Sequence, residues 1–193
     1  MRKCKRFSLH PNEHTIVKLL KSCAKLKDVE KGSKLHAHIV KRNLLKGNVF
    51  VGTALVDMYG KCGELAKAQD TFDQLQIHDV VAWNALIAGY VRQEMVEEAL
   101  NCFEQMQIHA ISPDAATFSC TLKACGVLRD IEKGAQICAL IERKRLWETS
   151  LPVGNAMIDM YVKCGFLEKA QYVFHKLPVC NVISWTALIS GYV

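Results

Sequence analysis

The sequence predicts an all-α fold, a right-handed α-solenoid of stacked helix-turn-helix repeats. Half of the 193 residues are apolar, which is enough to bury a sizeable core. These apolar residues recur at the i, i+3, i+4, i+7 spacing of amphipathic helices. The chain also repeats itself, because a shift of 102 residues lays Pro11 on Pro113 and gives about 36 identities in 81 aligned positions without a gap. Short repeats cannot bury their apolar faces alone, so we expect them to stack and to leave one concave face.

Two blocks carry most of the repetition. Residues 51–63, VGTALVDMYGKCG, match residues 153–165, VGNAMIDMYVKCG. Residues 80–87, VVAWNALI, match residues 182–189, VISWTALI. Such agreement over a fixed shift identifies a true internal repeat.

Each 102-residue period divides into three helical hairpins. In the interval 80–114 the first apolar stripe is Trp83, Leu86, Ile87 and Tyr90, and the second is Val96, Ala99, Leu100, Phe103 and Met106. We place further aromatic residues in such core stripes rather than on an exposed stacking surface: Phe72, Phe174 and Trp185. Between the two helices of a hairpin, Gly63 and Gly165 suit a helix C-terminus, and Asp28 and Asp130 suit an N-cap.

These signals divide the chain into a lead-in, five complete repeats and part of a sixth. Residues 1–12 form a basic lead-in without the apolar core of a secretory signal and without a clear transit peptide. The repeats are expected at 13–48, 49–79, 80–114, 115–150 and 151–181, with 182–193 as a partial repeat. Their lengths are 36, 31, 35, 36 and 31 residues. Since the chain stops inside a repeat, we expect it to be a fragment of a longer array or a truncated gene product.

The composition excludes several other classes of protein. Four prolines and 11 glycines supply too few turns for a β-sandwich. No apolar run approaches the roughly 18 residues of a transmembrane helix, so no membrane association is predicted. The odd count of nine cysteines, placed within apolar helical patterns, predicts reduced and buried thiols. Neither C-x-x-C nor H-x-E occurs, so we predict no metal site and no cofactor.

Several segments resemble one known repeat family. They are LKAC at 122–125, DMYGKCG at 57–63, DVVAWNALIAGY at 79–90 and SPD at 112–114. With the rotation of 36-, 31- and 35-residue units, the chain resembles the pentatricopeptide repeat (PPR) family in its plant-type PLS subclass, where long, short and standard motifs alternate. The resemblance covers about residues 11–193.

The resemblance implies a sequence-selective module that binds single-stranded RNA during RNA processing in mitochondria or chloroplasts. Family members with this rotation specify sites of C-to-U RNA editing, together with other editing factors. The editing chemistry resides in a C-terminal deaminase-like extension that this sequence lacks, so we expect no enzyme activity and no small-molecule substrate.

The family recognises about one base per repeat through the fifth residue of the first helix and the last residue of the repeat. Carried over, the pairs are Val17 with Asn48, Thr53 with Asp79, Asn84 with Asp114, Ser119 with Ser150, and Asn155 with Asn181, while Thr186 is a fifth residue whose partner is expected beyond the end of this sequence. By the family's code Thr53 with Asp79 favours G, Asn84 with Asp114 favours U, and Asn155 with Asn181 favours C over U. The two long repeats are nearly indifferent, which gives 5′-N-G-U-N-Y-3′.

The helical periodicity independently allows such a role for Asn84. It lies about 100° round the helix from the core residue Trp83 and shares a face with Val81 and Ala88. A small amide between apolar neighbours suits a base that is held by apolar contact and hydrogen-bonded on its edge. The alternative is that the fifth residues are simply solvated helix residues.

A series of cations follows eight residues after the fifth residues. This basic ladder consists of Lys25, Lys61, Arg92 and Lys163, and Val127 interrupts it. The side chains suit one phosphate contact per nucleotide. They also suit the C-terminal ends of helices, where the macrodipole favours cations, and both roles can hold together.

The net charge of +6 leans mildly towards a polyanionic partner and does not identify it. The alternative function is a protein-binding scaffold of the tetratricopeptide type, whose hairpins also stack. That family keeps a uniform 34-residue period, from which the 36/31/35 rotation departs. No nucleophile–base pair and no phosphate-binding glycine loop is present, which makes an enzyme the weakest interpretation.

Overall fold

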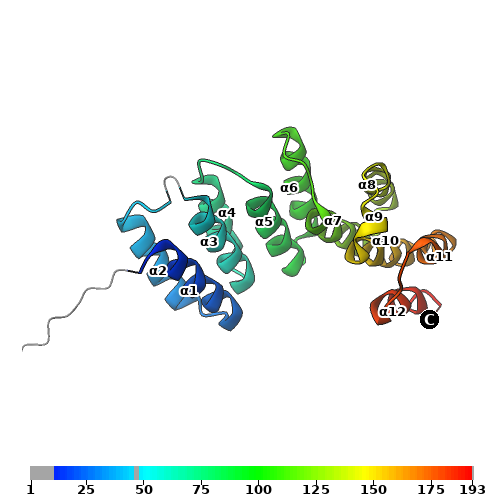
Figure 1. Ribbon diagram of the computed structural model, residues 1–193, viewed down its shortest axis with the longest axis horizontal. Coiled ribbons are helices and arrows are strands. Elements are labelled where there is room, and N and C mark those ends of the chain that lie inside the picture. Colours follow the sequence, from blue (N-terminus) through cyan, green and yellow to red (C-terminus); the bar gives the residue numbers. More distant parts are fainter. Residues whose placement is uncertain (1–10, 46–47, 193) are drawn as a thin grey trace, which may run out of the picture. The chain divides into compact units, whose positions relative to one another are not determined.

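The computed structural model describes residues 11–45 and 48–192, and within these ranges the chain forms twelve helices and no strand (Figure 1). The prediction of an all-α fold is confirmed. The helices are α1 (Glu13–Leu26), α2 (Val29–Lys41), α3 (Val49–Cys62), α4 (Leu65–Asp73), α5 (Val80–Arg92), α6 (Val96–Ile108), α7 (Ala115–Leu128), α8 (Ile131–Arg143), α9 (Leu146–Thr149), α10 (Leu151–Lys163), α11 (Leu167–Lys176) and α12 (Val182–Ile189). Most of the expected lead-in, residues 1–10, lies outside the described residues.

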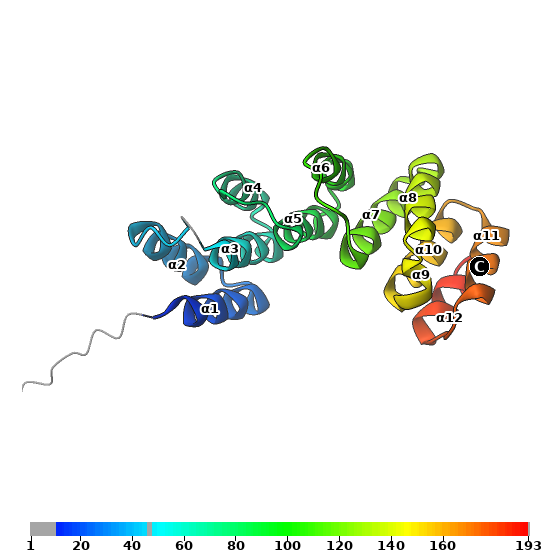
Figure 2. The ribbon, with the colours of Figure 1, turned by 45° about the horizontal axis from the view of Figure 1, so that its top comes forward.

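The chain divides into two compact units, one ending at Ile77 and the other beginning at His78. In the first unit α3 packs against α1, α2 and α4. Figure 2 shows α3 with α1 on one side and α4 on the other.

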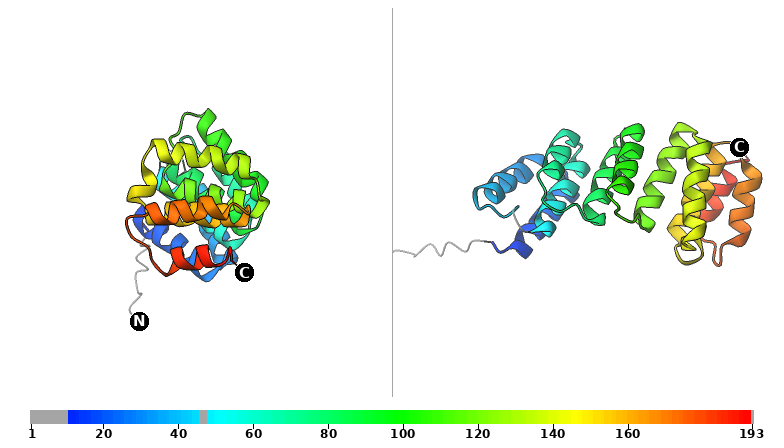
Figure 3. Two further views of the ribbon diagram at one scale, coloured as in Figure 1. Left: turned by 90° about the vertical axis from the view of Figure 1, so that its right-hand side faces the viewer. Right: turned by 90° about the horizontal axis from the view of Figure 1, so that it is seen from above.

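The second unit has two layers of helices. The first helices of successive hairpins, α5, α7, α10 and α12, contact one another in that order and form one layer. The second helices α6, α8 and α11 each pack on their own first helix and on the next one. Figure 3 shows α12, in red, beside α11, in orange. The layer of first helices carries the predicted base-recognition residues of this unit.

Four of the six predicted core aromatics are buried, while Tyr90 is half-buried and Trp185 is exposed. Trp83 is 5% exposed, and Phe72, Phe103 and Phe174 are buried as well. Trp185 is 53% exposed, so its placement in the core was wrong. Its ring meets that of Phe174 edge-on, with 4.7 Å between the ring centroids, and its helix α12 packs mainly against α10 and α11.

The two halves of the internal repeat pack in the same way at their glycines. A Cβ on Gly52 would come within 2.2 Å of Leu75, and one on Gly154 within 2.3 Å of Leu177. The leucine that follows the second helix therefore sits directly on the backbone of the first helix. Only glycine leaves room for this approach, and overpacking such a contact typically costs about 1–3 kcal/mol.

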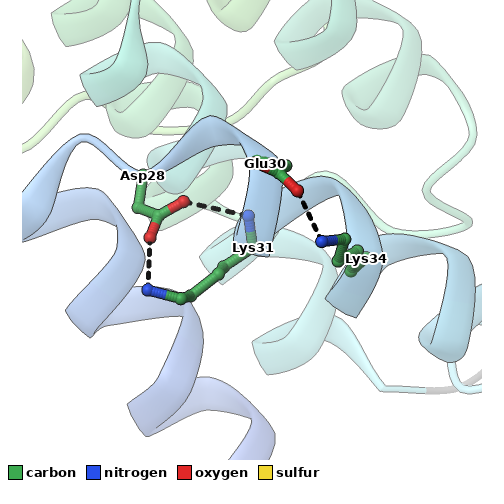
Figure 4. A network of polar contacts seen from close by, with 4 residues as sticks. All are labelled: Asp28, Glu30, Lys31 and Lys34. Carbon is green, nitrogen blue, oxygen red and sulfur yellow. Dashed lines mark hydrogen bonds and ion pairs between the residues drawn. The ribbon is translucent and has the colours of Figure 1, made fainter.

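The second helices of the long repeats begin at the predicted acidic caps. Asp28 accepts a hydrogen bond from the backbone N–H of Lys31 at 3.0 Å, and Asp130 accepts one from Lys133 at 2.9 Å. The Lys31 ammonium also pairs with Asp28 at 2.8 Å, and Lys34 pairs with Glu30 at 2.5 Å (Figure 4). Asp28 is partly buried and the other three side chains are largely exposed, so these pairs secure the start of α2 without adding much stability.

Every hairpin turn contains one residue with a left-handed backbone, always the fifteenth of its expected repeat. Gly63 and Gly165, predicted to end their helices, have φ of 86° and 83°. Lys27, Glu94 and Arg129 adopt the same region with φ of 53°, 60° and 56°. Side chains with a Cβ are strained there by about 1–2 kcal/mol, so the three non-glycine turns store strain that the two glycine turns avoid.

Candidate nucleic-acid interface

The last residues of the expected repeats are the N-caps of the helices that follow them. Each of four side chains accepts a hydrogen bond from the backbone N–H three residues later: Asn48 at 3.1 Å, Asp79 at 2.8 Å, Asp114 at 2.9 Å and Asn181 at 3.0 Å. Ser150 occupies the N-cap of α10 without a side-chain bond. Capping therefore gives these positions a folding role beside the one inferred from the family resemblance.

The fifth residues lie one on each first helix and differ in exposure. Thr53 and Asn155 are buried, each 8% exposed. Val17, Asn84 and Ser119 are partly exposed, and Thr186 is exposed. The alternative that all of them are freely solvated therefore does not hold for Thr53 and Asn155.

Two of the predicted pairs are joined by hydrogen bonds. The amide nitrogen of Asn84 donates to the carboxylate of Asp114 at 3.0 Å. The amide nitrogen of Asn155 donates to the side-chain oxygen of Asn181 at 3.4 Å. In both pairs the last residue of the repeat reaches back to the fifth residue.

The structure does not link the pairs of the long repeats. The hydroxyl of Ser119 donates to Ala115 of its own helix at 2.8 Å, and the amide of Asn48 donates to Glu13. Thr186 likewise donates to the carbonyl of Val182 at 2.7 Å.

The remaining pair falls across the unit boundary. Thr53 belongs to the first unit and Asp79, which caps α5, to the second. The Thr53 hydroxyl is buried, and it has no hydrogen-bond partner in the described part of the chain.

Sequence reasoning missed two hydroxyls that join these pairs. Thr117 donates to the amide oxygen of Asn84 at 2.6 Å, and Ser184 donates to that of Asn155 at 2.6 Å. Each is the third residue of the next expected repeat and completes a capping box with the last residue before it. A hydroxyl three residues after a capping Asp or Asn was visible in the sequence. Its contact with a side chain about 30 residues earlier was not.

A groove of about 450 Å³ opens on the layer of first helices in the second unit. It is lined by the fifth residues of three successive hairpins, Ser119 on α7, Asn155 on α10 and Thr186 on α12. Apolar side chains, among them Val182 and Ile183, complete its wall. The groove thus presents small polar groups at regular intervals within an apolar surface.

Two lysines of the basic ladder form ion pairs within their own helices, Lys61 in the first unit and Lys163 in the second. Lys61 pairs with Asp57 at 2.7 Å and Lys163 with Asp159 at 2.6 Å, each one helical turn apart. Because these pairs are partly exposed, each is worth at most about 1 kcal/mol and leaves its ammonium available to another anion. Lys25 and Arg92 are exposed.

A further lysine lies at the groove of the second unit. Lys123 lines the groove four residues after Ser119 and makes no ion pair with any described residue. It lies on α7, where Val127 interrupts the ladder. The ladder spacing could not reveal it, because it sits one helical turn nearer to the fifth residue.

The carboxyl of Asp114 is held in its ionised form. Partial burial alone would raise its pKa, but hydrogen bonds from the Thr117 backbone, the Asn84 amide and the Ala116 backbone lower that pKa below the ordinary 3.8. A carboxylate can only accept hydrogen bonds, so the ionised Asp114 fixes the amide nitrogen of Asn84 towards itself.

The prediction of reduced and buried thiols holds for four of the eight described cysteines, whereas the other four are only half-buried: Cys62, Cys120, Cys164 and Cys180. All eight cysteines among the described residues are free, and burial raises the pKa of the Cys125 thiol to about 12 and that of Cys138 to about 11. Within residues 11–45 and 48–192, no three His, Cys, Asp or Glu side chains gather in a way that could hold a metal ion. No helix in these ranges combines the length and the apolar character needed to cross a bilayer.

Comparison with known families identifies matching repeats over more than half of the chain. A model described as PPR repeat family matches residues 78–126, and a model described as PPR repeat matches residues 53–80 and 155–182.

Similar plant proteins come from Arabidopsis thaliana. The mitochondrial pentatricopeptide repeat-containing protein At3g09040 is 41% identical over 94% of this chain, and the chloroplastic protein At4g18520 is 37% identical over 94%. The chain spans 17% and 29% of their lengths, so it corresponds to a small part of each relative.

Two solved structures share the fold. The PPR10 protein in complex with an 18-nucleotide psaJ RNA element superimposes with a TM-score of 0.74 at 19% identity, over 96% of this chain and 28% of that one. The PPR domain of Arabidopsis thaliana protein-only RNase P 1, in complex with tRNA, gives 0.63 at 15% identity, over 93% of this chain and 98% of that domain. These likenesses confirm the predicted solenoid of helix-turn-helix repeats.

Proposed function

Since the chain belongs to the pentatricopeptide repeat family, we propose that it is a sequence-selective module for single-stranded RNA that acts in organellar RNA processing. The observation that carries this proposal is the groove of the second unit, lined by three successive fifth residues. Single-stranded RNA suits such a surface because its unstacked bases can be splayed out and hydrogen-bonded at their edges.

The dimensions and chemistry of the groove support one base per hairpin. Neighbouring first helices pack directly on each other, so the fifth residues recur at the interaxial distance of about 8–10 Å. Asn155 offers an amide, while Ser119 and Thr186 offer hydroxyl oxygens that can still accept a hydrogen bond. Val182 and Ile183 supply apolar contact for base faces.

Cations along the groove support a negatively charged partner. Lys123 lies within the groove, and Lys163 stands beside it. Together with the rest of the basic ladder they would neutralise phosphates, and this makes binding dependent on salt.

The finer assignments rest on the resemblance to the PLS subclass. They are the repeat boundaries at 13–48, 49–79, 80–114, 115–150, 151–181 and 182–193, the preference 5′-N-G-U-N-Y-3′ and the selection of C-to-U editing sites with other editing factors. The mitochondrial and chloroplastic relatives support an organellar location.

Filter binding with a randomised RNA pool tests the proposal. We expect the full chain to enrich single-stranded sequences with G at the second and U at the third position, to prefer them over duplex RNA, and to lose affinity as salt rises. Equal binding of duplex and single strands, or no enrichment at any position, contradicts it. A chain that binds no RNA but captures helical peptides would instead favour the tetratricopeptide-type scaffold.

A further inference from the structure

Two hydroxyl groups in the second unit make the same contact in two different hairpins. Thr117 at the start of α7 donates to the side-chain oxygen of Asn84, and Ser184 at the start of α12 donates to that of Asn155, both at 2.6 Å. In each case the opposite end of the amide, its nitrogen, donates to the last residue of the repeat.

We propose that Thr117 and Ser184 are positioning residues that fix the orientation of the Asn84 and Asn155 amides and thereby set base specificity. An asparagine side chain carries a donor end and an acceptor end of nearly equal shape. The hydroxyl binds the amide oxygen and the last residue of the repeat binds the amide nitrogen. One N–H donor and one oxygen lone pair of the asparagine then remain for a base edge, and their positions are fixed. The inference rests on the proposed RNA-binding function, because the orientation of the amide affects specificity only if a base binds to it.

The two sites differ in how strongly the hydroxyl is needed. At Asn84 the ionised Asp114 accepts from the amide nitrogen at 3.0 Å and fixes the orientation by itself to a large degree. At Asn155 the partner is the neutral amide of Asn181, and the distance is 3.4 Å. The hydroxyl of Ser184 is therefore the main restraint on Asn155.

The pattern along the chain agrees with this role. With the proposed repeat boundaries, a hydroxyl occupies the third position of the next repeat after both asparagine fifth residues. After the fifth residues Val17, Thr53 and Ser119, the equivalent positions are Val51, Ala82 and Val153. Fifth residues that carry no amide are therefore not followed by a hydroxyl at the third position of the next repeat.

Helix capping alone does not account for these contacts. Both hydroxyls accept a hydrogen bond from the backbone N–H of the N-cap residue at 3.1 Å, which stabilises the helix start. That bond uses the oxygen as an acceptor. The single hydroxyl proton then has two acceptors within reach, the N-cap side chain (Asp114 at 3.0 Å, Asn181 at 3.1 Å) and the fifth residue, which is nearer at 2.6 Å. In both hairpins the proton is within reach of the fifth residue, and a purely capping role would affect stability without affecting base choice.

The test compares Ser184→Ala and Thr117→Val with the unmodified full chain. In filter binding we expect Ser184→Ala to reduce the discrimination at the base opposite Asn155 from about 5- to 150-fold towards parity, and to leave the other positions unchanged. Thr117→Val should reduce discrimination opposite Asn84 by a smaller factor, and Ser184→Thr should restore the first effect. Thr121→Val is the matched control, because its buried hydroxyl bonds only to the backbone of α7.

A second readout requires no RNA. The side-chain N–H signals of Asn155 in an amide NMR spectrum should be well separated in the unmodified chain and should converge in Ser184→Ala as the amide is released. Unchanged signals, or unchanged discrimination in a variant that still binds RNA, overturns the inference. If the unmodified chain binds no RNA, the proposed function fails, and the NMR comparison still decides whether the hydroxyl orients the amide.

Discussion

The left-handed turn residues allow a direct measurement of backbone strain. We predict that Gly165→Ala lowers the free energy of unfolding by about 1 kcal/mol. Gly165 has a φ of 83°, and a Cβ placed on it has no atom within 4 Å. The substitution therefore introduces no clash, and what remains is the left-handed penalty of about 1–2 kcal/mol, offset in part by about 0.4–1 kcal/mol of reduced entropy in the unfolded chain.

The converse substitution should stabilise the protein. Glu94 occupies the equivalent turn between α5 and α6 with a φ of 60°, and its side chain is exposed. Glu94→Gly removes the strain, so we expect a gain of similar size. The neighbouring Gln93 has an ordinary φ of −94°, and Gln93→Gly, which adds only flexibility to the unfolded chain, should destabilise.

Thermal denaturation followed by circular dichroism measures all three variants. For a chain of this length, 1 kcal/mol corresponds to about 2–4 °C in the melting temperature. Opposite signs for Glu94→Gly and Gln93→Gly are the decisive result. If the two glycine variants behave alike, or if Gly165→Ala is neutral, the left-handed strain does not contribute as argued.

Four further predictions concern the candidate interface. Replacing the whole basic ladder with glutamine should lower the affinity for all RNA sequences about equally. The slope of log affinity against log salt concentration should become shallower by about 0.7 for each phosphate that is no longer neutralised. A sequence-dependent loss of affinity would refute the phosphate role. Asp159→Asn removes the carboxylate that pairs with Lys163. The repulsion between that carboxylate and a phosphate is worth about 1 kcal/mol near the surface, so RNA affinity should rise by roughly five-fold. An unchanged dissociation constant would show that Lys163 does not contact RNA. Thr53→Asn should turn the preference at the second base from G towards U in pool selection and leave the other positions alone, and a preference that ignores the substitution contradicts the code. Asp114 has a lowered pKa in the folded chain, so its contribution is complete above the unfolded value near 3.8 and is lost as the pH falls through the folded value; urea midpoints at pH 5 and pH 3 should differ more for the unmodified chain than for Asp114→Asn.

The fold was predictable because it depends on periodicity. The stripe that begins at Trp83 and the caps at Asp28 and Asp130 are local signals, and all appear where expected. Trp185 follows the same stripe and is nevertheless exposed, because a stripe indicates which face can be buried and not whether a second helix covers it.

The site was predictable in part. The family resemblance named Asn84, Asp114, Asn155 and Asn181, and the structure joins them in pairs. The contacts of Thr117 depend on the packing of consecutive first helices, which no local pattern encodes. The pairing of Lys163 with Asp159 was visible as an i, i+4 spacing, whereas the left-handed turn at Glu94 was not, since glutamate carries no signal for it.

The N-cap position of the last residues also limits how the specificity of such a chain can change. The side chains favoured at an N-cap are Asn, Asp, Ser and Thr, and replacing them with Ala costs about 0.5–2 kcal/mol. All five last residues of this chain belong to that small group: Asn48, Asp79, Asp114, Ser150 and Asn181. An exchange between Asn and Asp alters hydrogen bonding towards a ligand while the helix start keeps its cap, but a side chain without a capping oxygen would destabilise the start of the next helix. The residue types that can be introduced at the last position of a repeat are therefore restricted by helix capping before any ligand is considered.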